Sequence, residues 1–191
     1  CCRILQGSIE AVLQAAASAE WRDHVEIQRI QIHAAPILER SPFTSTSPRT
    51  MWDAQFSVPF ACAMALLRIP PGPEWFTGKW YEDPAVLGLL QKVTVAPLQP
   101  GTADTSTHAS ICARATILLR DNRSWAAAVG IPRGEASNPM TKEALDEKFL
   151  RLAEYRLTPE EAGSLLSRLH SLQRVASVKS LVGTIGPAYQ S

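Results

Sequence analysis

The chain has 191 residues, of which 46% are apolar, and its 19 Lys and Arg against 18 Asp and Glu leave a net charge of +1. A chain of this length buries about 70% of its unfolded surface, so it can build a core without disulfides or a structural metal. The near-neutral charge disfavours nucleic-acid binding, and the longest apolar run, 61–67, is far shorter than the roughly 20 residues of a membrane helix. We therefore expect a soluble globular protein with no nucleic-acid or membrane partner.

The cysteines and the first residue bear on origin and compartment. The chain begins at Cys1 with no visible signal peptide, so we expect a processed product or a piece of a longer protein. The other cysteines are Cys2, Cys62 and Cys112, and no two of them form a CxxC pair. This usage predicts reduced thiols in the cytoplasm, or in the mitochondrial matrix if the source is eukaryotic.

The N-terminal third alternates between one helix, one strand and a loop. Apolar residues at helical spacing predict a helix over 8–19, with Ser8 as its N-cap. Residues 25–33 alternate as a strand, and the phase slips at Gln28-Arg29 as in a β-bulge. A polar, proline-bearing loop follows over 41–49.

The segment DAQFSVPFACAMALL, 53–67, predicts a buried helix. Pro59 fits the first helical turn if Ser57 is the N-cap. Phe60 and the apolar residues after it then form one stripe, and Pro70-Pro71-Gly72 ends the helix.

The middle of the chain predicts one more helix and three strands. A short helix is expected over 83–90 and a strand over 92–95. Residues 109–119 read as a long strand that turns at 121–123 and returns over 125–129 as a hairpin.

The last third is a loop followed by helices. Residues 130–139 read as loop, 141–153 as helix, and Thr158-Pro159-Glu160-Glu161 as a capping box that opens another helix. The order of elements predicts an α+β fold with a small antiparallel sheet, not alternating βαβ units. We place a domain boundary between 1–139 and 140–191.

Standard metal, cofactor and nucleophile motifs are missing from the sequence. There is no HExxH, P-loop, GxGxxG after a strand, or GxSxG. The four histidines are too scattered to predict a metal site; they are His24, His33, His108 and His170.

The start of the Ser57 helix is the best candidate for ligand binding. A helix N-terminus offers free N–H groups and a positive dipole end, which suit a carboxylate. Arg49, Asp53 and Gln55 lie just before it, and we expect Arg3 to approach from the N-terminal segment. Together they predict a site for a small polycarboxylate; the alternative is an ordinary capped helix with a solvated arginine.

Three stretches in this order resemble the MmgE/PrpD family, which includes 2-methylcitrate dehydratase, cis-aconitate decarboxylase and related epimerases. Residues 1–11 resemble the segment after the family's Lys-x-aromatic-Pro, and 53–60 resemble its DAQFS-x-P-Y. Gly134, Asn138-Pro139-Met140-Thr141 and Lys148-Phe149 resemble its glycine followed by NPM(S/T) and KF. The resemblance covers nearly the whole chain.

The resemblance implies a domain organisation and a chemistry. It implies that 1–139 form an α+β lid, and that the helices of 140–191 pack on a large helical domain that this chain lacks and that supplies most proton-transferring residues. The implied chemistry needs no metal or cofactor: a base removes a proton beside a carboxylate and a β-hydroxyl leaves. Arg3, Arg49, Gln55 and Ser57 would then bind the substrate.

Two positions depart from the family pattern. Decarboxylase members carry His where this chain has Cys2, and many members carry Tyr where it has Phe60, which lacks a hydroxyl. The family's catalytic lysine would lie just before Cys1. The departures leave the catalytic residues unassigned.

The expected function is that of a dehydratase part acting on a 2-methylcitrate-type polycarboxylate, inactive as this chain alone and a homodimer when complete. Two alternatives stay open. One is a cis-aconitate-type decarboxylase or epimerase of the same family, and the other is a non-catalytic split or degenerate lid that binds a helical partner.

Overall fold

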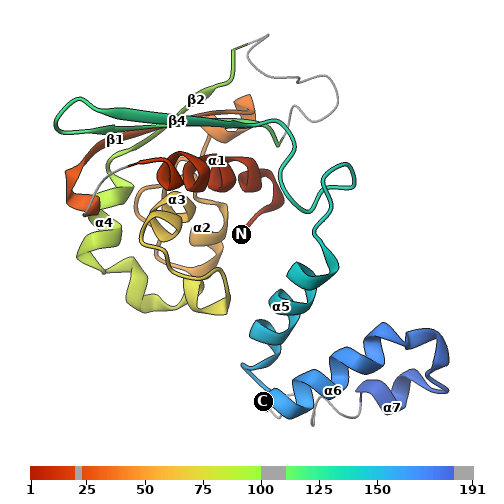
Figure 1. Ribbon diagram of the computed structural model, residues 1–191. Helices are drawn as coiled ribbons and strands as arrows, with labels where there is room; N and C mark the ends of the chain where they lie inside the picture. Colours follow the sequence, from red (N-terminus) through yellow and green to blue (C-terminus); the bar gives the residue numbers. More distant parts are fainter. Residues whose placement is uncertain (20–22, 100–110, 183–191) are drawn as a thin grey trace. The chain divides into compact units, whose positions relative to one another are not determined.

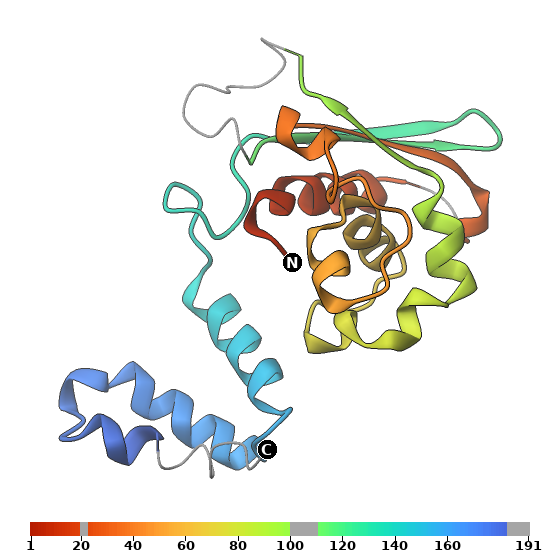
Figure 2. The same cartoon turned by 180° about the vertical axis from the view of Figure 1, so that it is seen from behind.

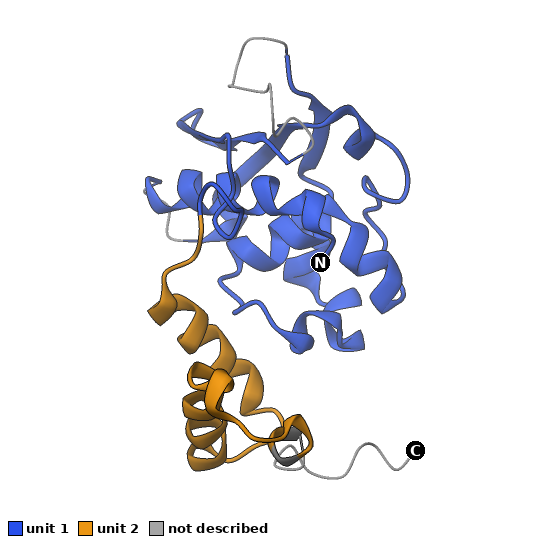
Figure 3. Cartoon of the chain, turned by 90° about the vertical axis from the view of Figure 1, so that its right-hand side faces the viewer, with its two compact units in different colours: residues 1–138 blue, residues 139–191 orange. Residues whose placement is uncertain are grey.

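The computed structural model of the protein describes residues 1–19, 23–99 and 111–182. The chain divides into two compact units, 1–138 and 139–191, which Figure 3 colours separately. The first unit combines a four-stranded sheet with helices, and the described part of the second is helical. The α+β class predicted from the sequence is confirmed.

The sheet has the strand order β2-β1-β3-β4. Its strands are β1 (Ile27–Ala34), β2 (Val93–Pro97), β3 (Ala113–Leu119) and β4 (Ser124–Val129). β3 pairs antiparallel with both β1 and β4, and the predicted bulge in β1 appears as a register shift between Ile27 and Arg29.

One pairing corrects the expectation of an antiparallel sheet. β1 and β2 run parallel, with Ile30 opposite Val93, so the sheet is mixed. Parallel neighbours need a long crossover connection. Residues 35–92 supply it, and they contain three of the helices of the first unit.

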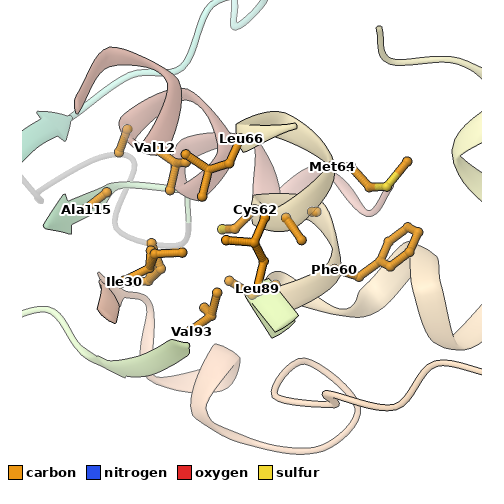
Figure 4. Close-up of a cluster of buried hydrophobic side chains, with 14 of the residues drawn as sticks. Val12, Ile30, Phe60, Cys62, Met64, Leu66, Leu89, Val93 and Ala115 are labelled. Carbon is orange, nitrogen blue, oxygen red and sulfur yellow. The ribbon is translucent and has the colours of Figure 1, made fainter. Parts of the chain in front are cut away.

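The α-helices of the first unit lie on one face of the sheet (Figures 1 and 2). They are α1 (Gln6–Ala17), α2 (Met51–Phe56), α3 (Val58–Leu66) and α4 (Pro84–Leu90). Every residue of α3 is buried, which explains why this helix is apolar all round. Figure 4 shows its side chains packed with those of α1, β1 and β2.

Short 3-10 turns complete the described elements. They are η1 (Arg3–Leu5), η2 (His24–Glu26), η3 (Pro36–Glu39), η4 (Pro73–Phe76), η5 (Gly78–Tyr81) and η6 (Leu172–Arg174).

The start of α1 differs from the prediction. Ser8 is not the N-cap, because η1 leads directly into the helix and Leu5 occupies the cap position. Ser8 is buried inside the first turn, and its hydroxyl has no hydrogen-bond partner. Beside it, a Cβ on Gly7 would lie 1.9 Å from the carbonyl oxygen of Ile111, so α1 rests directly on the backbone that leads into β3.

The predicted hairpin is confirmed as β3 and β4. Asn122 in its turn adopts a φ of 68°, a left-handed conformation that asparagine tolerates well. The strand predicted over 109–119 begins at Ala113, and its first two residues lie outside the described residues, as does His108.

The described helices of the second unit are α5 (Lys142–Ala153), α6 (Pro159–His170) and α7 (Val178–Val182). Thr141 caps α5, and the predicted capping box of Thr158 and Glu161 opens α6. Asp146 joins the two helices, since it accepts hydrogen bonds from Lys142 Nζ at 3.0 Å and His170 Nε2 at 2.8 Å. Within the described ranges, no helix is long and apolar enough to cross a membrane.

Candidate functional site

The N-terminal segment meets the helix that carries Gln55. The backbone N–H of Cys2 donates to the carbonyl of Gln55 at 2.8 Å, although the two residues are far apart in the sequence. Cys2 and Gln55 are both half-buried. The structure therefore brings together three of the residues predicted for the site: Cys2, Arg3 and Gln55.

Arg3 forms a two-point ion pair with Glu135. Its Nε lies 3.0 Å from Glu135 Oε1, and its Nη2 contacts Glu135 Oε2 directly. The hydrogen bond and charge of Glu135 raise the pKa of Arg3 above its usual value. The arginine side chain is 64% exposed and the glutamate side chain only 9%, so Arg3 points its guanidinium at a nearly buried carboxylate.

The loop around Glu135 is held by its own backbone and by α1. Gly134 has a φ of 100°, which glycine adopts without strain, and its N–H donates to Asn138 O at 2.8 Å. The Asn138 side chain donates to Ile131 O at 2.9 Å. Glu10 on α1 accepts from the N–H of Arg133 at 2.8 Å. These contacts fix Glu135 where Arg3 can reach it.

Sequence reasoning missed Glu135. It lies 132 positions from Arg3, and no local pattern joins two such residues. The one available signal was its place directly after Gly134, inside a stretch that resembles a family motif.

Ser57 is the N-cap of α3, as predicted. Its hydroxyl accepts from the N–H of Phe60 at 3.0 Å and donates to Ser45 O at 2.6 Å. The N–H of Val58 donates to Phe43 O at 2.9 Å, and Pro59 has no N–H. In this described turn, 58–60, no backbone donor is left for a carboxylate, so Ser57 acts by anchoring the loop around Ser45 to the helix.

Arg49 and Asp53 lie at the start of α2. The N–H groups of Arg49 and Thr50 each donate to Asp53 Oδ2 at 3.0 Å, and the Thr50 hydroxyl does so at 2.9 Å. The bond from Arg49 and then that from the Thr50 side chain lower the pKa of Asp53, so this carboxylate is ionised. Arg49 is exposed and precedes the helix that carries Gln55; among the described contacts, none joins it to Arg3.

Phe60 is completely buried and packs against an aromatic loop. Its ring centroid is 5.9 Å from that of Tyr81, whose hydroxyl donates to Phe76 O at 3.0 Å. Burial, with a smaller contribution from the charge of Asp53, raises the pKa of Tyr81, so this phenol is neutral. The position that departs from the family pattern therefore has a tyrosine hydroxyl in its neighbourhood, though one bound to the backbone.

The thiols and possible metal ligands are dispersed. Cys62 and Cys112 are buried, Cys2 is half-buried and Cys1 is exposed. Burial raises the pKa of Cys62 to about 12, which makes it a poor nucleophile. Within the described ranges, no three His, Cys, Asp or Glu side chains gather as a metal site would require.

Comparison with known proteins identifies the family. A search of the curated proteins found no match. The family model of the MmgE/PrpD C-terminal domain matches residues 1–173, which is most of the chain and includes Cys2, Arg3, Gln55 and Glu135. The chain therefore belongs to the MmgE/PrpD family, and it carries that family's C-terminal domain.

Proposed function

We propose that this chain forms the substrate-covering part of a lyase, a dehydratase that acts on a 2-methylcitrate-type polycarboxylate without a cofactor. Family membership supports the proposal. The observation that carries it is the hydrogen bond from Cys2 N–H to Gln55 O, because it places the guanidinium-bearing segment beside a half-buried amide side chain.

Each candidate residue has its own role in binding the substrate. Arg3 is the group that holds a substrate carboxylate, since a guanidinium binds carboxylates through two parallel hydrogen bonds and Arg3 already does so with Glu135. Gln55 orients the substrate, and Arg49 supplies a second, exposed cation at the start of α2. Ser57 fixes the corner between α2 and α3.

The reaction is an elimination. A base takes the proton from the carbon beside a carboxylate, the C–O bond of the β-hydroxyl breaks with protonation by an acid, and an alkene and water form. We assign the base and the acid to the helical domain that completes the protein. A lid that excludes water strengthens the charge interactions that stabilise the developing anion.

The helices of the second unit supply the contact with that helical domain. α5 has no buried residue, and its apolar Leu145 and Leu152 are 52% and 37% exposed. We propose that they pack on the helical domain, within a complete protein that is a homodimer. We also propose a location in the cytoplasm, or in the mitochondrial matrix if the source is eukaryotic, from the cysteine usage of the sequence.

The proposal is tested by an alkene-absorbance assay on the chain joined to its helical domain, with 2-methylcitrate, citrate and cis-aconitate as substrates. We expect 2-methylcitrate to be dehydrated, and Arg3→Gln to raise KM at least roughly ten-fold because a charged hydrogen bond to substrate is lost.

The matched control is Arg123→Gln, which removes an exposed arginine from the β3–β4 turn. It should leave KM unchanged. Release of carbon dioxide from cis-aconitate without dehydration of 2-methylcitrate would overturn the proposal in favour of a decarboxylase. No turnover of any of the three would favour a non-catalytic lid.

A further inference from the structure

A pocket of about 420 Å³ lies on the sheet face opposite the α-helices of the first unit, because its residues in β2 and β3 alternate with the buried residues that face those helices. Its walls come from β1, β2, β3 and the turn before β2, with the lining residues Gln28, Arg29, Gln91, Lys92, Thr94 and Leu118. None of these belongs to the candidate site around Arg3 and Gln55. The six side chains include two cations and no carboxylate.

The β1 bulge creates one wall of this pocket. Ile27 and Ile30 are both buried in the core, and the two residues between them, Gln28 and Arg29, are both exposed. In an unbroken strand, successive side chains alternate between faces, so one of these two would point into the core. The register shift between Ile27 and Arg29 instead directs both toward the pocket.

Three cations gather at this end of the sheet. Arg29 lies opposite Leu118 of β3. Arg120 follows Leu118 by two residues, so the alternation of side chains places it on the same face of the sheet. Arg120 Nε donates to Val25 O at 3.2 Å, and Lys92 Nζ lies 3.4 Å from His24 O, so both side chains are held near η2. Partial burial and then the charge of Arg120 lower the pKa of Lys92, against an opposing contribution from Asp23.

The donor set matches one chemical class. A guanidinium and an ammonium supply charged donors, and the amides of Gln28 and Gln91 supply neutral ones, whereas the Thr94 hydroxyl already donates to Ile30 O at 3.4 Å. The dianion of a phosphate ester offers only acceptors, and arginine binds it through two hydrogen bonds. The volume is in the range of small-molecule pockets.

We propose that this pocket binds the phosphate group of a small molecule, at a site separate from the one that holds the polycarboxylate. The bound phosphate is placed between Arg29 and Lys92, over Leu118. The net charge of only +1 disfavours a nucleic-acid backbone as the source of the phosphate, so we assign it to a small ligand.

The test is a calorimetric titration of the 191-residue chain with pyrophosphate at constant ionic strength. We expect saturable binding that weakens at least roughly ten-fold in Arg29→Gln and in Lys92→Gln. The matched control is Arg114→Gln. Arg114 is an exposed cation on the same face of β3 as Leu118, but it does not line the pocket.

Each outcome decides the proposal. Unchanged affinity in Arg114→Gln with loss in the other two supports it, whereas equal loss in all three shows a diffuse charge effect and overturns it, as does the absence of saturable binding. Equal affinity for citrate with the same variant pattern would assign the pocket to carboxylates and overturn the phosphate assignment. Orthophosphate binding as tightly as ADP would identify free phosphate as the source, and tighter ADP binding would identify a nucleotide.

The variants keep the test interpretable if folding is affected. Lys92→Gln removes a cation that burial and Arg120 already disfavour, so the unfolding temperature should not fall. A variant with unchanged unfolding temperature and unchanged pyrophosphate affinity would overturn the proposal.

Discussion

At the scale of single residues, the ion pair of Arg3 and Glu135 is the most consequential contact. The arginine that we propose holds a substrate carboxylate is already paired with a protein carboxylate, through the same two-point geometry. Under that proposal, substrate and Glu135 compete for one guanidinium. A nearly buried Glu135 would hold Arg3 in place while the site is empty and would weaken substrate binding by the same interaction.

This competition predicts the effect of Glu135→Gln. We expect the variant to bind citrate more tightly, by roughly five-fold, because Arg3 is released while the side chain keeps its shape. Titration of the 191-residue chain with citrate measures it. The control is Glu10→Gln, which removes the same charge from a residue that anchors the same loop without touching Arg3. Equal or weaker citrate binding in Glu135→Gln would contradict the competition.

Residue-level reasoning from sequence succeeded where the controlling interaction was local. Ser57 with Pro59 two positions later, and Thr158 with Glu161, follow capping rules that act within one turn. Ser8 looked equally suitable, but η1 extends the helix backwards and buries it. The pairing of Arg3 with Glu135 depends on how α1 and a distant loop pack, which no local rule describes.

At the scale of elements, the difference between local and long-range interactions explains which strand pairings the sequence predicts. Alternation and a turn predicted the β3–β4 hairpin, because its two strands are adjacent in the sequence. The strand predicted over 92–95 is present as β2, but its parallel pairing with β1 contradicts the predicted antiparallel sheet, because a crossover of several helices joins the two strands. Periodicity shows that a strand exists, but the direction of its partner is decided by the path between them.

The strength of the contact between α5 and α6 depends on pH. Burial opposes ionisation of Asp146, but the hydrogen bonds from Lys142 and His170 prevail and lower its pKa. Because the pKa is lower in the folded state, the stabilisation is complete above the unfolded value of about 3.9 and is lost as the pH falls through the folded value.

We therefore expect the protection of the α5 and α6 amides from hydrogen exchange to fall when the pH is lowered below about 4. This acid step should be absent in Asp146→Asn. Glu147→Gln removes the same charge from the next position of α5, outside the contact, and should retain the step. An identical acid step in Asp146→Asn would show that the contact does not contribute.

At the scale of the whole molecule, the two units differ in how much of their apolar surface is covered. The first has a contiguous core between its sheet and helices (Figure 4). In the second, α5 buries no residue and leaves leucines in contact with water. The first unit thus has a core of its own, whereas α5 leaves exposed the apolar face that we propose contacts the helical domain.

This difference predicts the outcome of replacing both Leu145 and Leu152 with Gln. Because the side chains are already exposed, the unfolding temperature should stay within about 2 °C, while co-purification with the helical domain should be lost. Leu13→Gln is the control, since Leu13 is an exposed leucine of α1 in the first unit. Undiminished co-purification of the double variant would refute the assignment of this face.

Gly7 lets α1 pack closely against the backbone that leads into β3. The missing side chain lets α1 sit on the carbonyl of Ile111, and Arg3 lies only four positions earlier. The position from which Arg3 reaches Glu135 therefore depends on the absence of a side chain at position 7, outside the proposed site. A bulkier residue there would push α1 away from the backbone that leads into β3. Under the proposed function, that shift would change the affinity for a carboxylate although every group that contacts the ligand stays the same.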